Sequence, residues 1–302
     1  MKIGRAAWRT DTGRRRMRNE DAYVFEPPLF AIADGMGGAR AGEVAAGIAA
    51  AALREGRRDA IDEATLEASI AEANRRVWER SLADPATAGM GTTVTVALVD
   101  APAGEVVFGH VGDSRAYRLR GDELEQITTD HSLVAELVES GVLTPEEAER
   151  HPQRSAITRA VGTESAIEVD VFRVPAELGD LILLCSDGLT DMLSEDEIAA
   201  ALVEAGRDPE AAADRLVAAA NARGGEDNIT VVLFELVEGE PEPVTHADDD
   251  QQAAGTAEPT ESHADDGVRR HGPGSGGRLA SLALILLVLG VGVLALYWGI
   301  SR

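Results

Sequence analysis

The sequence predicts an α+β fold of antiparallel sheets flanked by helices. Short apolar segments typical of strands cluster in runs, and they do not alternate strictly with helices as they would in a doubly wound parallel sheet. Two of these segments flank Pro27-Pro28, which suits a tight turn between neighbouring strands. The chain has 302 residues, enough to bury a large core.

The expected strands and helices follow from the spacing of apolar residues. The expected strands are residues 22–34 (two strands around Pro27-Pro28), 91–100, 105–113, 114–127, 169–174, 180–187 and 228–236. Alanine-rich amphipathic segments predict helices at about 42–57 and 65–81. Thr144 and Ser194 each precede a glutamate by three residues, a helix-start signal, and a further helix is expected from Asp208-Pro209 to about Arg223.

The charge is strongly acidic and unevenly distributed. The formal net charge is −25, residues 238–267 hold ten acidic and no basic residues, and residues 268–302 hold four arginines and no acid. Residues 1–237 therefore carry −19. This balance disfavours nucleic acid as a partner, because binding its backbone depends on Lys and Arg, and it favours cations. Cys185 is the only cysteine, which excludes an intrachain disulfide and is typical of a cytosolic body.

The composition predicts three parts: a folded domain over 1–237, a disordered acidic linker over 238–278 and a transmembrane helix over 279–298. The linker is poor in aliphatic residues, so it cannot bury enough apolar area to fold. The segment 279–298 has no charge and ends in Tyr297-Trp298, which matches the length and interface residues of a bilayer span. Three arginines precede it and one follows it, so we expect a single-pass anchor with the folded domain in the cytoplasm.

Acidic residues lie at the ends of apolar strands. They are Asp34, Asp113, Asp187 and Asp227, and three of the four adjoin a glycine, which allows tight turns and close backbone approach. A single acid at a strand end is ordinarily a solvated turn residue. Four in the same context predict a site for a hard divalent cation, Mg²⁺ or Mn²⁺, because buried carboxylates repel one another unless a cation offsets the repulsion.

Further charged residues precede the strand that begins at Ala22. Glu20 and Asp21 add two carboxylates, and Arg16 lies four residues before Glu20. A guanidinium beside divalent cations would suit a phosphoryl group, whose oxygen atoms match its planar fork. From local sequence alone, Arg16 could equally be a solvated member of the segment RRRMR.

Seven segments together resemble the bacterial metal-dependent protein phosphatases of the PPM (type 2C) family. In order they are RRRMRNEDAY, FAIADGMGGARAGEVAA, GTTVTVAL, GHVGDSRAYRLR, HPQRSAITRAVG, LILLCSDGLTDML and GGEDNITVVL. The resemblance covers about residues 3–237. It implies a four-layer α-β-β-α sandwich of two antiparallel sheets, with a dinuclear Mn²⁺ or Mg²⁺ site at one edge and a third, weaker metal site.

The resemblance also implies a role for each site residue. Asp34 would bridge both metals and the Gly35 carbonyl would join the second, while Arg16 would bind the substrate phosphate. Asp21 would orient bound water. The remaining metal ligands implied are Asp187 and Asp227 on the first metal, Glu20 on the second, and Asp113 on the third, with Asp187 and Asp191 as its possible companions.

The implied reaction is direct attack on phosphorus by a hydroxide that bridges two metals, without a phospho-enzyme intermediate. Many eukaryotic members have His directly after the bridging Asp-Gly pair as a proposed proton donor, whereas this sequence has Met36, which cannot donate. His131 and His151 are candidates by location in the segment 129–160, which is similar to the family's flap beside the active site. Each is otherwise interpreted as a surface loop or helix histidine.

The leading hypothesis is a membrane-tethered protein serine/threonine phosphatase acting on phosphorylated proteins, including membrane-associated Ser/Thr kinases and their substrates. The alternative is a catalytically inactive scaffold that binds phosphoproteins at the membrane, against which the full set of site residues argues. A Walker-type nucleotide site would need a lysine after the glycine-rich loop, and Lys2 is the only lysine in the chain.

Overall fold

The computed structural model describes residues 1–37, 41–56, 62–148 and 150–240. The chain divides into two units, Met1–Thr245 and His246–Arg302, and every described residue lies in the first. No helix within the described ranges has the length and apolar character needed to cross a membrane. The predicted span 279–298 and nearly all of the predicted linker lie outside the described residues.

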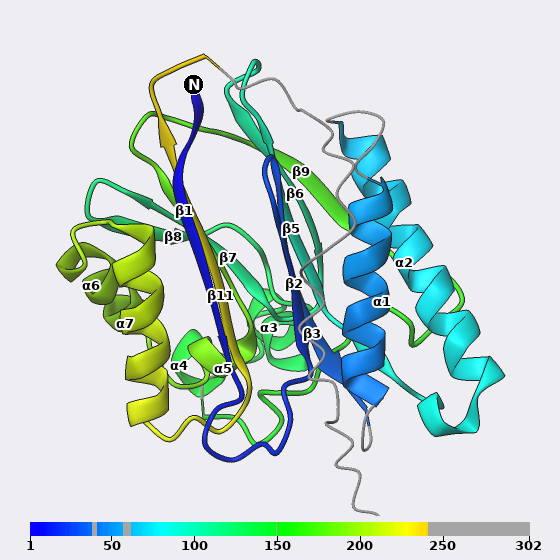
Figure 1. The fold of residues 1–302 in the computed structure, drawn as a ribbon. Coiled ribbons are helices and arrows are strands. Elements are labelled where there is room, and N and C mark those ends of the chain that lie inside the picture. Colours follow the sequence, from blue (N-terminus) through cyan, green and yellow to red (C-terminus); the bar gives the residue numbers. More distant parts are fainter. Residues whose placement is uncertain (38–40, 57–61, 149, 241–302) are drawn as a thin grey trace, which may run out of the picture. The chain divides into compact units, whose positions relative to one another are not determined.

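Two antiparallel sheets form the centre of the first unit (Figure 1). One has the order β1-β11-β10-β7-β8 and the other β2-β3-β5-β6-β9, with β4 paired to β3. The strands of the first sheet are β1 (Lys2–Asp11), β7 (Arg115–Arg120), β8 (Glu123–Gln126), β10 (Leu181–Cys185) and β11 (Ile229–Val237). Those of the second are β2 (Asp21–Glu26), β3 (Leu29–Met36), β4 (Gly91–Thr92), β5 (Val94–Asp100), β6 (Glu105–Val111) and β9 (Asp170–Pro175).

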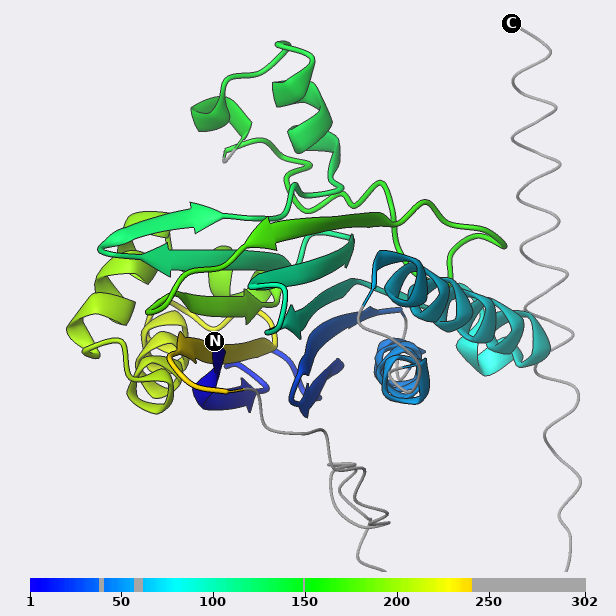
Figure 2. The ribbon, with the colours of Figure 1, turned by 90° about the horizontal axis from the view of Figure 1, so that it is seen from above.

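Helices cover the outer face of each sheet, so the α-β-β-α layering is confirmed (Figure 1). On the β2–β9 sheet lie α1 (Ala41–Gly56) and α2 (Glu63–Ala83), and the short 3₁₀ helix η1 (Pro85–Thr87) follows α2. On the other sheet lie α6 (Glu195–Glu204) and α7 (Pro209–Ala222). The short helices are α3 (Leu133–Glu139), α4 (Pro145–Ala148) and α5 (Asp187–Thr190). In Figure 2 the segment with α3 and α4 projects away from the sheets.

Burial on both faces explains the composition of the central strands. All five residues of β10 are buried apolar residues, because one face meets the second sheet and the other meets the helices. Between the sheets, Phe30 stacks on Phe234 with ring centroids 4.2 Å apart. Small residues such as Ala45 and Ala49 on α1 are fully buried, which lets this helix approach its sheet closely.

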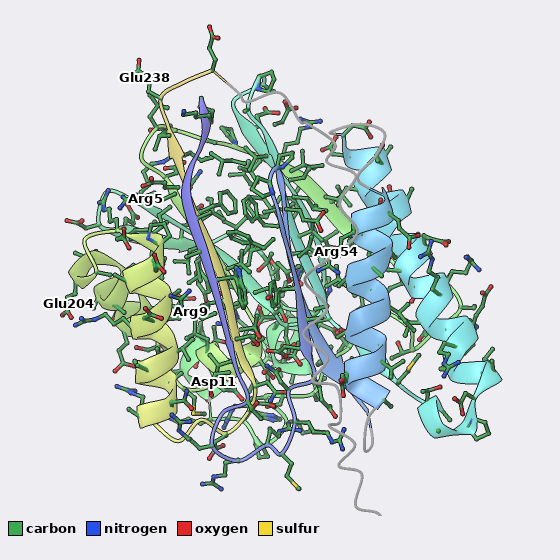
Figure 3. The ribbon with its side chains drawn as sticks, viewed as in Figure 1. Arg5, Arg9, Asp11, Arg54, Glu204 and Glu238 are labelled. Carbon is green, nitrogen blue, oxygen red and sulfur yellow. The ribbon has the colours of Figure 1, made fainter. Side chains whose placement is uncertain are left out.

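The N-terminal strand β1 was missed in the sequence. It pairs with β11 at the edge of its sheet, and Ala7 is its one fully buried apolar residue, so it lacks the apolar run that marks the other strands. Arg5 and Arg9 extend from it toward the α7 side (Figure 3), where Arg9 binds Asp214 at 2.6 Å. Pairing along β11 and these ion pairs, rather than apolar periodicity, therefore hold β1 in place.

Most other predicted elements are confirmed within a few residues. The segment 114–127 forms a hairpin, β7 and β8, which turns at Gly121 with φ of +59°. The helix starts at Thr144 and Ser194 both form with the expected reciprocal bonds to Glu147 and Glu197. The single-turn helix α5 was not predicted, since four residues are too few to show a helical period.

Candidate active site and metal centre

The acidic strand ends meet at one end of the sandwich, the lower end in Figure 1. In one sheet, β3 and β6 both pair antiparallel with β5, so their C-terminal ends lie at the same end of the sheet. In the other sheet, β10 ends beside the start of its antiparallel partner β11. These ends bring together Asp34 on β3, Asp113 after β6, Asp187 after β10 and Asp227 before β11. The neighbouring aspartates of the group raise the pKa of Asp34 and of Asp187, as expected where carboxylates lie close together.

Asp21 adds a fifth carboxylate because it faces Asp34 across the β2–β3 pair. The hydroxyl groups of Ser186 and Thr230 donate to Asp21 Oδ2 at 2.9 and 2.6 Å. Asp21 Oδ1 is buried and has no hydrogen-bond partner among the described residues. Two fixed donors on one oxygen orient this carboxylate and leave the other oxygen available.

The backbone of Asp34 is fixed by the start of β5. The amide of Asp34 donates to Thr93 Oγ1 at 3.0 Å, and the Asp34 carbonyl accepts from the Thr93 amide at 2.9 Å and from Thr92 Oγ1 at 2.8 Å. Thr93 Oγ1 also lies 2.7 Å from Ser114 Oγ, beside Asp113. One hydroxyl network therefore links the positions of two of the acidic strand ends.

Burial and mutual repulsion keep these carboxyl groups from ionising readily. Removal from water, followed by repulsion from neighbouring aspartates, raises the pKa of Asp34 and of Asp187 well above the usual range. Burial likewise raises the pKa of Asp21 to about 6 and, with repulsion from Asp130, that of Asp113 to about 6. A group of this kind gains much from a cation, which offsets repulsion between the carboxylates.

The donor set fits a hard divalent cation in chemistry and in available oxygen atoms. The Oδ1 atoms of Asp21, Asp113 and Asp187 are each buried without a hydrogen-bond partner in the described part of the chain. Such orphaned oxygen atoms are rare in proteins unless a water or ion satisfies them. Among the described residues, however, no three acidic, His or Cys side chains converge closely enough to define a single ion position. The structure thus gathers the carboxylates without setting a coordination geometry.

Glu20 and Gly35 approach this cluster from the turn before β2 and from β3. The amide of Gly35 donates to the Glu20 carbonyl at 3.2 Å. A Cβ on Gly35 would lie 2.2 Å from the Gly42 carbonyl oxygen, and one on Gly42 would lie 2.5 Å from Glu20 Oε2. Both positions therefore require glycine, because the start of α1 packs directly against β3 and the turn before β2. Burial raises the pKa of Glu20, and nearby Arg16 opposes that rise.

Arg16 lies at the edge of the acidic cluster with its side chain half exposed. Its Nη2 atom is 2.5 Å from Asp227 Oδ2, and the exposed fraction of the side chain is 52%. The sequence left two interpretations of Arg16, a phosphate-binding residue and a solvated residue of the segment RRRMR. The contact with Asp227 excludes an unpaired, fully solvated Arg16. An exposed guanidinium beside buried carboxylates can also reach an anion that approaches from solvent.

Asn228 holds the site together and was given no role from the sequence. Its Nδ2 donates to the carbonyls of Thr12 and Arg18 at 3.0 and 2.8 Å, and its Oδ1 accepts from the Glu20 amide at 2.7 Å. It therefore fastens the loop with Arg16 to the start of β11. The signal available in the sequence was a polar residue directly after Asp227 at the start of an otherwise apolar strand.

Both histidines of the segment 129–160 make hydrogen bonds within the described chain. His131 is buried: its Nδ1 accepts from the Gly112 amide at 3.1 Å and its Nε2 lies 3.2 Å from Asp170 Oδ2. Burial lowers its pKa, and its bond to the Gly112 amide tethers the segment to the turn before Asp113. The prediction that it is a surface histidine is wrong, because packing around Gly112 encloses it. His151 binds the amide of Gln153 within its own turn.

Met36 and Asp191 complete the rim. Met36 pairs with Gly91 in the sheet and its side chain lies over that glycine, so it supplies an apolar contact at the place where a proton donor could stand. Asp191 caps α5, and Arg154 of the segment 129–160 lies 3.7 Å from it. Asp191 contributes to the repulsion at Asp187 and Asp113, which places it beside these two residues as expected.

Comparisons with known proteins match this arrangement to one family. The family model for protein phosphatase 2C matches residues 13–220. The chain belongs to the protein phosphatase 2C family. Among its relatives, the serine/threonine phosphatase Stp of Listeria innocua is 41% identical over 242 residues, which cover 76% of this chain and 95% of the relative. The predicted enzyme class, a protein serine/threonine phosphatase, is thereby confirmed.

Relatives from mycobacteria extend the comparison to solved structures. The serine/threonine protein phosphatase PstP of Mycobacterium tuberculosis is 41% identical over 261 residues, which cover 82% of this chain and 49% of the relative. A crystal structure of the Mycobacterium tuberculosis PstP superposes on the present chain with a TM-score of 0.74 at 40% identity. The match covers 78% of the present chain and all of the PstP chain. A PstP catalytic domain in complex with two manganese ions has a TM-score of 0.71 at 38% identity, over 78% and 99% of the two chains.

Proposed function

We propose that this phosphatase hydrolyses phosphoserine and phosphothreonine in proteins with two divalent ions, Mn²⁺ or Mg²⁺, held by its acidic cluster. The observation that carries the proposal is the set of buried carboxylates with unpaired oxygen atoms beside Arg16. The proposed ligands are the carboxylates of Asp34, Asp187, Asp227 and Glu20 with the Gly35 carbonyl, and Asp113 would serve a third ion. When bound, the ions would activate water as the nucleophile and offset charge on the phosphoryl oxygens.

The chain's own residues would bind and orient the reactants. The Arg16 guanidinium, half exposed beside Asp227, would bind the phosphoryl group of the substrate. Asp21, fixed by the hydroxyls of Ser186 and Thr230, would accept a hydrogen bond from the attacking water through Oδ1. The leaving alkoxide would take its proton from solvent, because Met36 has none to give.

Substitution of Asp34 by Asn tests this proposal. We expect Asp34→Asn to lower kcat/KM for a phosphothreonine peptide and for p-nitrophenyl phosphate by about 10³-fold, since a central charge is lost without a change in size. Stabilisation of the fold by Mn²⁺, measured as a rise in Tm, should shrink as well. Asp122→Asn, in an exposed turn, is the matched control and should behave like the unaltered chain.

Two outcomes would contradict the metal mechanism. One is full turnover by the Asp34→Asn variant, and the other is turnover by the unaltered chain that a strong chelator does not change. A chain that binds phosphopeptides tightly but never hydrolyses them would instead support the scaffold alternative.

We further propose that the residues after 240 tether the phosphatase to the inner face of the cell membrane, near membrane-associated Ser/Thr kinases and their substrates. The support is the uncharged segment 279–298 with its flanking arginines. The full chain is expected in the membrane fraction of lysed cells, and a chain ending at Glu240 in the soluble fraction. Full chain in the soluble fraction would overturn the tether.

A further inference from the structure

Arg14, Arg15 and Arg18, the arginines on either side of Arg16, stand at the rim of the candidate active site without a role so far. Residues 14–18, here called the basic loop, hold four arginines and no acid in a chain of net charge −25. The exposed side-chain fractions are 61% for Arg14 and 70% for Arg15. Met17 is 98% exposed, so no other part of the described chain covers the crest of the loop.

Hydrogen bonds hold the backbone of the basic loop against the segment that carries Asp227. The amides of Arg14 and Arg15 both donate to the Gly225 carbonyl, at 2.7 and 3.2 Å. The side chain of Asn228 binds the residues just before and at the end of the loop. Gly13 allows this approach: its φ is +78°, and a Cβ there would lie 2.2 Å from the Asp227 carbonyl oxygen. The loop is therefore preorganised beside the reaction centre.

Most of the positive charge of the basic loop is not engaged in close ion pairs. Arg16 alone binds a carboxylate tightly, that of Asp227. Arg14 lies 3.9 Å from Asp11, which marks the start of this turn in Figure 3, and Arg15 lies 3.7 Å from Glu226. For Arg18, the described part of the chain offers no ion-pair partner. Long exposed pairs of this kind are weak and exchange readily.

From this arrangement we propose that Arg14, Arg15 and Arg18 bind acidic side chains on either side of the phosphorylated residue, so that the preferred substrates are phosphopeptides with flanking Asp and Glu. The inference rests on the proposed function. Arg16 engages the phosphate, and its neighbours on the same fixed loop reach the adjoining residues of an extended peptide. The guanidinium fork suits carboxylates. Without such a loop, an acidic surface would favour basic peptides.

Three phosphothreonine peptides that differ only in their flanks test the proposal: one with Asp and Glu, one with Ser and Ala, one with Arg. With the full chain at low salt, we expect kcat/KM for the acidic peptide to exceed that for the neutral one by about 30-fold, since each of the three exposed pairs contributes roughly threefold. The preference should nearly vanish in 0.5 M salt, because the screening length there is about three times shorter than in 0.05 M salt.

The matched variants locate the effect. The triple change Arg14→Gln, Arg15→Gln and Arg18→Gln should bring the acidic-to-neutral ratio close to one. Turnover of p-nitrophenyl phosphate, which has no flanks, should stay within twofold. A control that removes the same charge from exposed arginines elsewhere should keep the ratio; it consists of Arg75→Gln, Arg80→Gln and Arg215→Gln.

The possible failures are distinct. A ratio near one in the unaltered chain, a preference for the arginine-flanked peptide, or an unchanged ratio in the triple variant would each overturn the role of the basic loop while leaving the phosphatase function intact. Absence of turnover with every peptide would instead contradict the proposed function. If the triple variant does not fold, the salt dependence of the unaltered chain decides.

Discussion

The carboxylate of Asp21 in the candidate active site is oriented through one oxygen and left open at the other. Asp21 takes two hydroxyl bonds on one oxygen and has none on the other. Asp187 likewise has a buried Oδ1 that no described residue contacts by a hydrogen bond. Half-satisfied groups of this kind weaken the fold by themselves and become favourable only with a cation bound. The acids are readable in the sequence, but the hydroxyls that orient them, at Ser186 and Thr230, lie about 165 and 209 residues from Asp21.

A buried histidine behind the site gives a pH prediction. His110 is fully buried, with its ring nitrogens 3.0 Å from Thr95 Oγ1 and 3.1 Å from the Thr129 carbonyl. Burial, and then the neighbouring ring of His131, lower its pKa from 6.5 to about 3, with Asp170 opposing. Between pH 6.5 and 3 the unfolded chain therefore binds more protons than the folded chain. The contribution of neutral, buried His110 to the free energy of unfolding is therefore fully present above pH 6.5 and is lost as the pH falls toward 3.

Comparison with a His110→Gln variant isolates this effect. The difference in free energy of unfolding between the unaltered chain and the variant should shrink by about 1.36 kcal/mol per pH unit below 6.5. Urea unfolding with chelator at several pH values measures it. His151→Gln, in an outer turn, is the control and should follow the unaltered chain. Parallel pH curves for His110→Gln and the unaltered chain would show that His110 does not titrate on unfolding.

At the scale of elements, loops between strands position the site and side chains fasten the loops. The segment between β1 and β2 carries Arg16 and Glu20, and Asn228 at the start of β11 binds it at three points. The strand β1, which leads into this segment, was not predicted because it lacks an apolar pattern. It is held by pairing with β11 and by ion pairs such as Arg9–Asp214. Local apolar pattern could identify β10 and β11 but not this edge strand.

The substitution Asn228→Ala tests whether this side chain holds the segment between β1 and β2 in place. The buried side chain makes three hydrogen bonds, so its loss should lower the free energy of unfolding by about 3 kcal/mol. It should also raise KM for p-nitrophenyl phosphate, because Arg16 is no longer held in place. Urea unfolding and steady-state kinetics measure the two effects.

Asn221→Ala is the matched control for this prediction. Asn221 lies on the neighbouring α7 and donates one side-chain bond, to Asp11 at 3.2 Å. Its loss should lower the free energy of unfolding by about 1 kcal/mol and leave KM unchanged. Equal effects of the two substitutions on KM would mean that Asn228 does not position the basic loop.

At the scale of the whole molecule, the two sheets and their covering helices lie within residues 1–240. The last strand, β11, ends at Val237, three residues before the described part ends. It is central to the first sheet between β1 and β10, so the chain must be complete to this point before the sheet can form.

A chain ending at Glu240 should therefore keep the Tm and the kcat/KM for p-nitrophenyl phosphate of the full chain. Circular dichroism and steady-state kinetics measure these quantities. A chain ending at Cys185 is the control and should not fold, because it lacks β11 and exposes both neighbouring strands. A clear fall in Tm for the chain ending at Glu240 would mean that residues after 240 stabilise the domain.

Local patterns in the amino-acid sequence were enough to predict the fold class, most strands and helices, and the acidic residues of the candidate site. These depend on local patterns: apolar runs, helix-start residues and acids beside glycine, as at Asp34-Gly35. Only the tertiary structure decided how Asn228 fastens a loop 216 residues away in sequence at Thr12, why His131 is enclosed, and that the arginines of the basic loop face solvent beside Asp227. These features arise from contacts between distant segments, which no local pattern records.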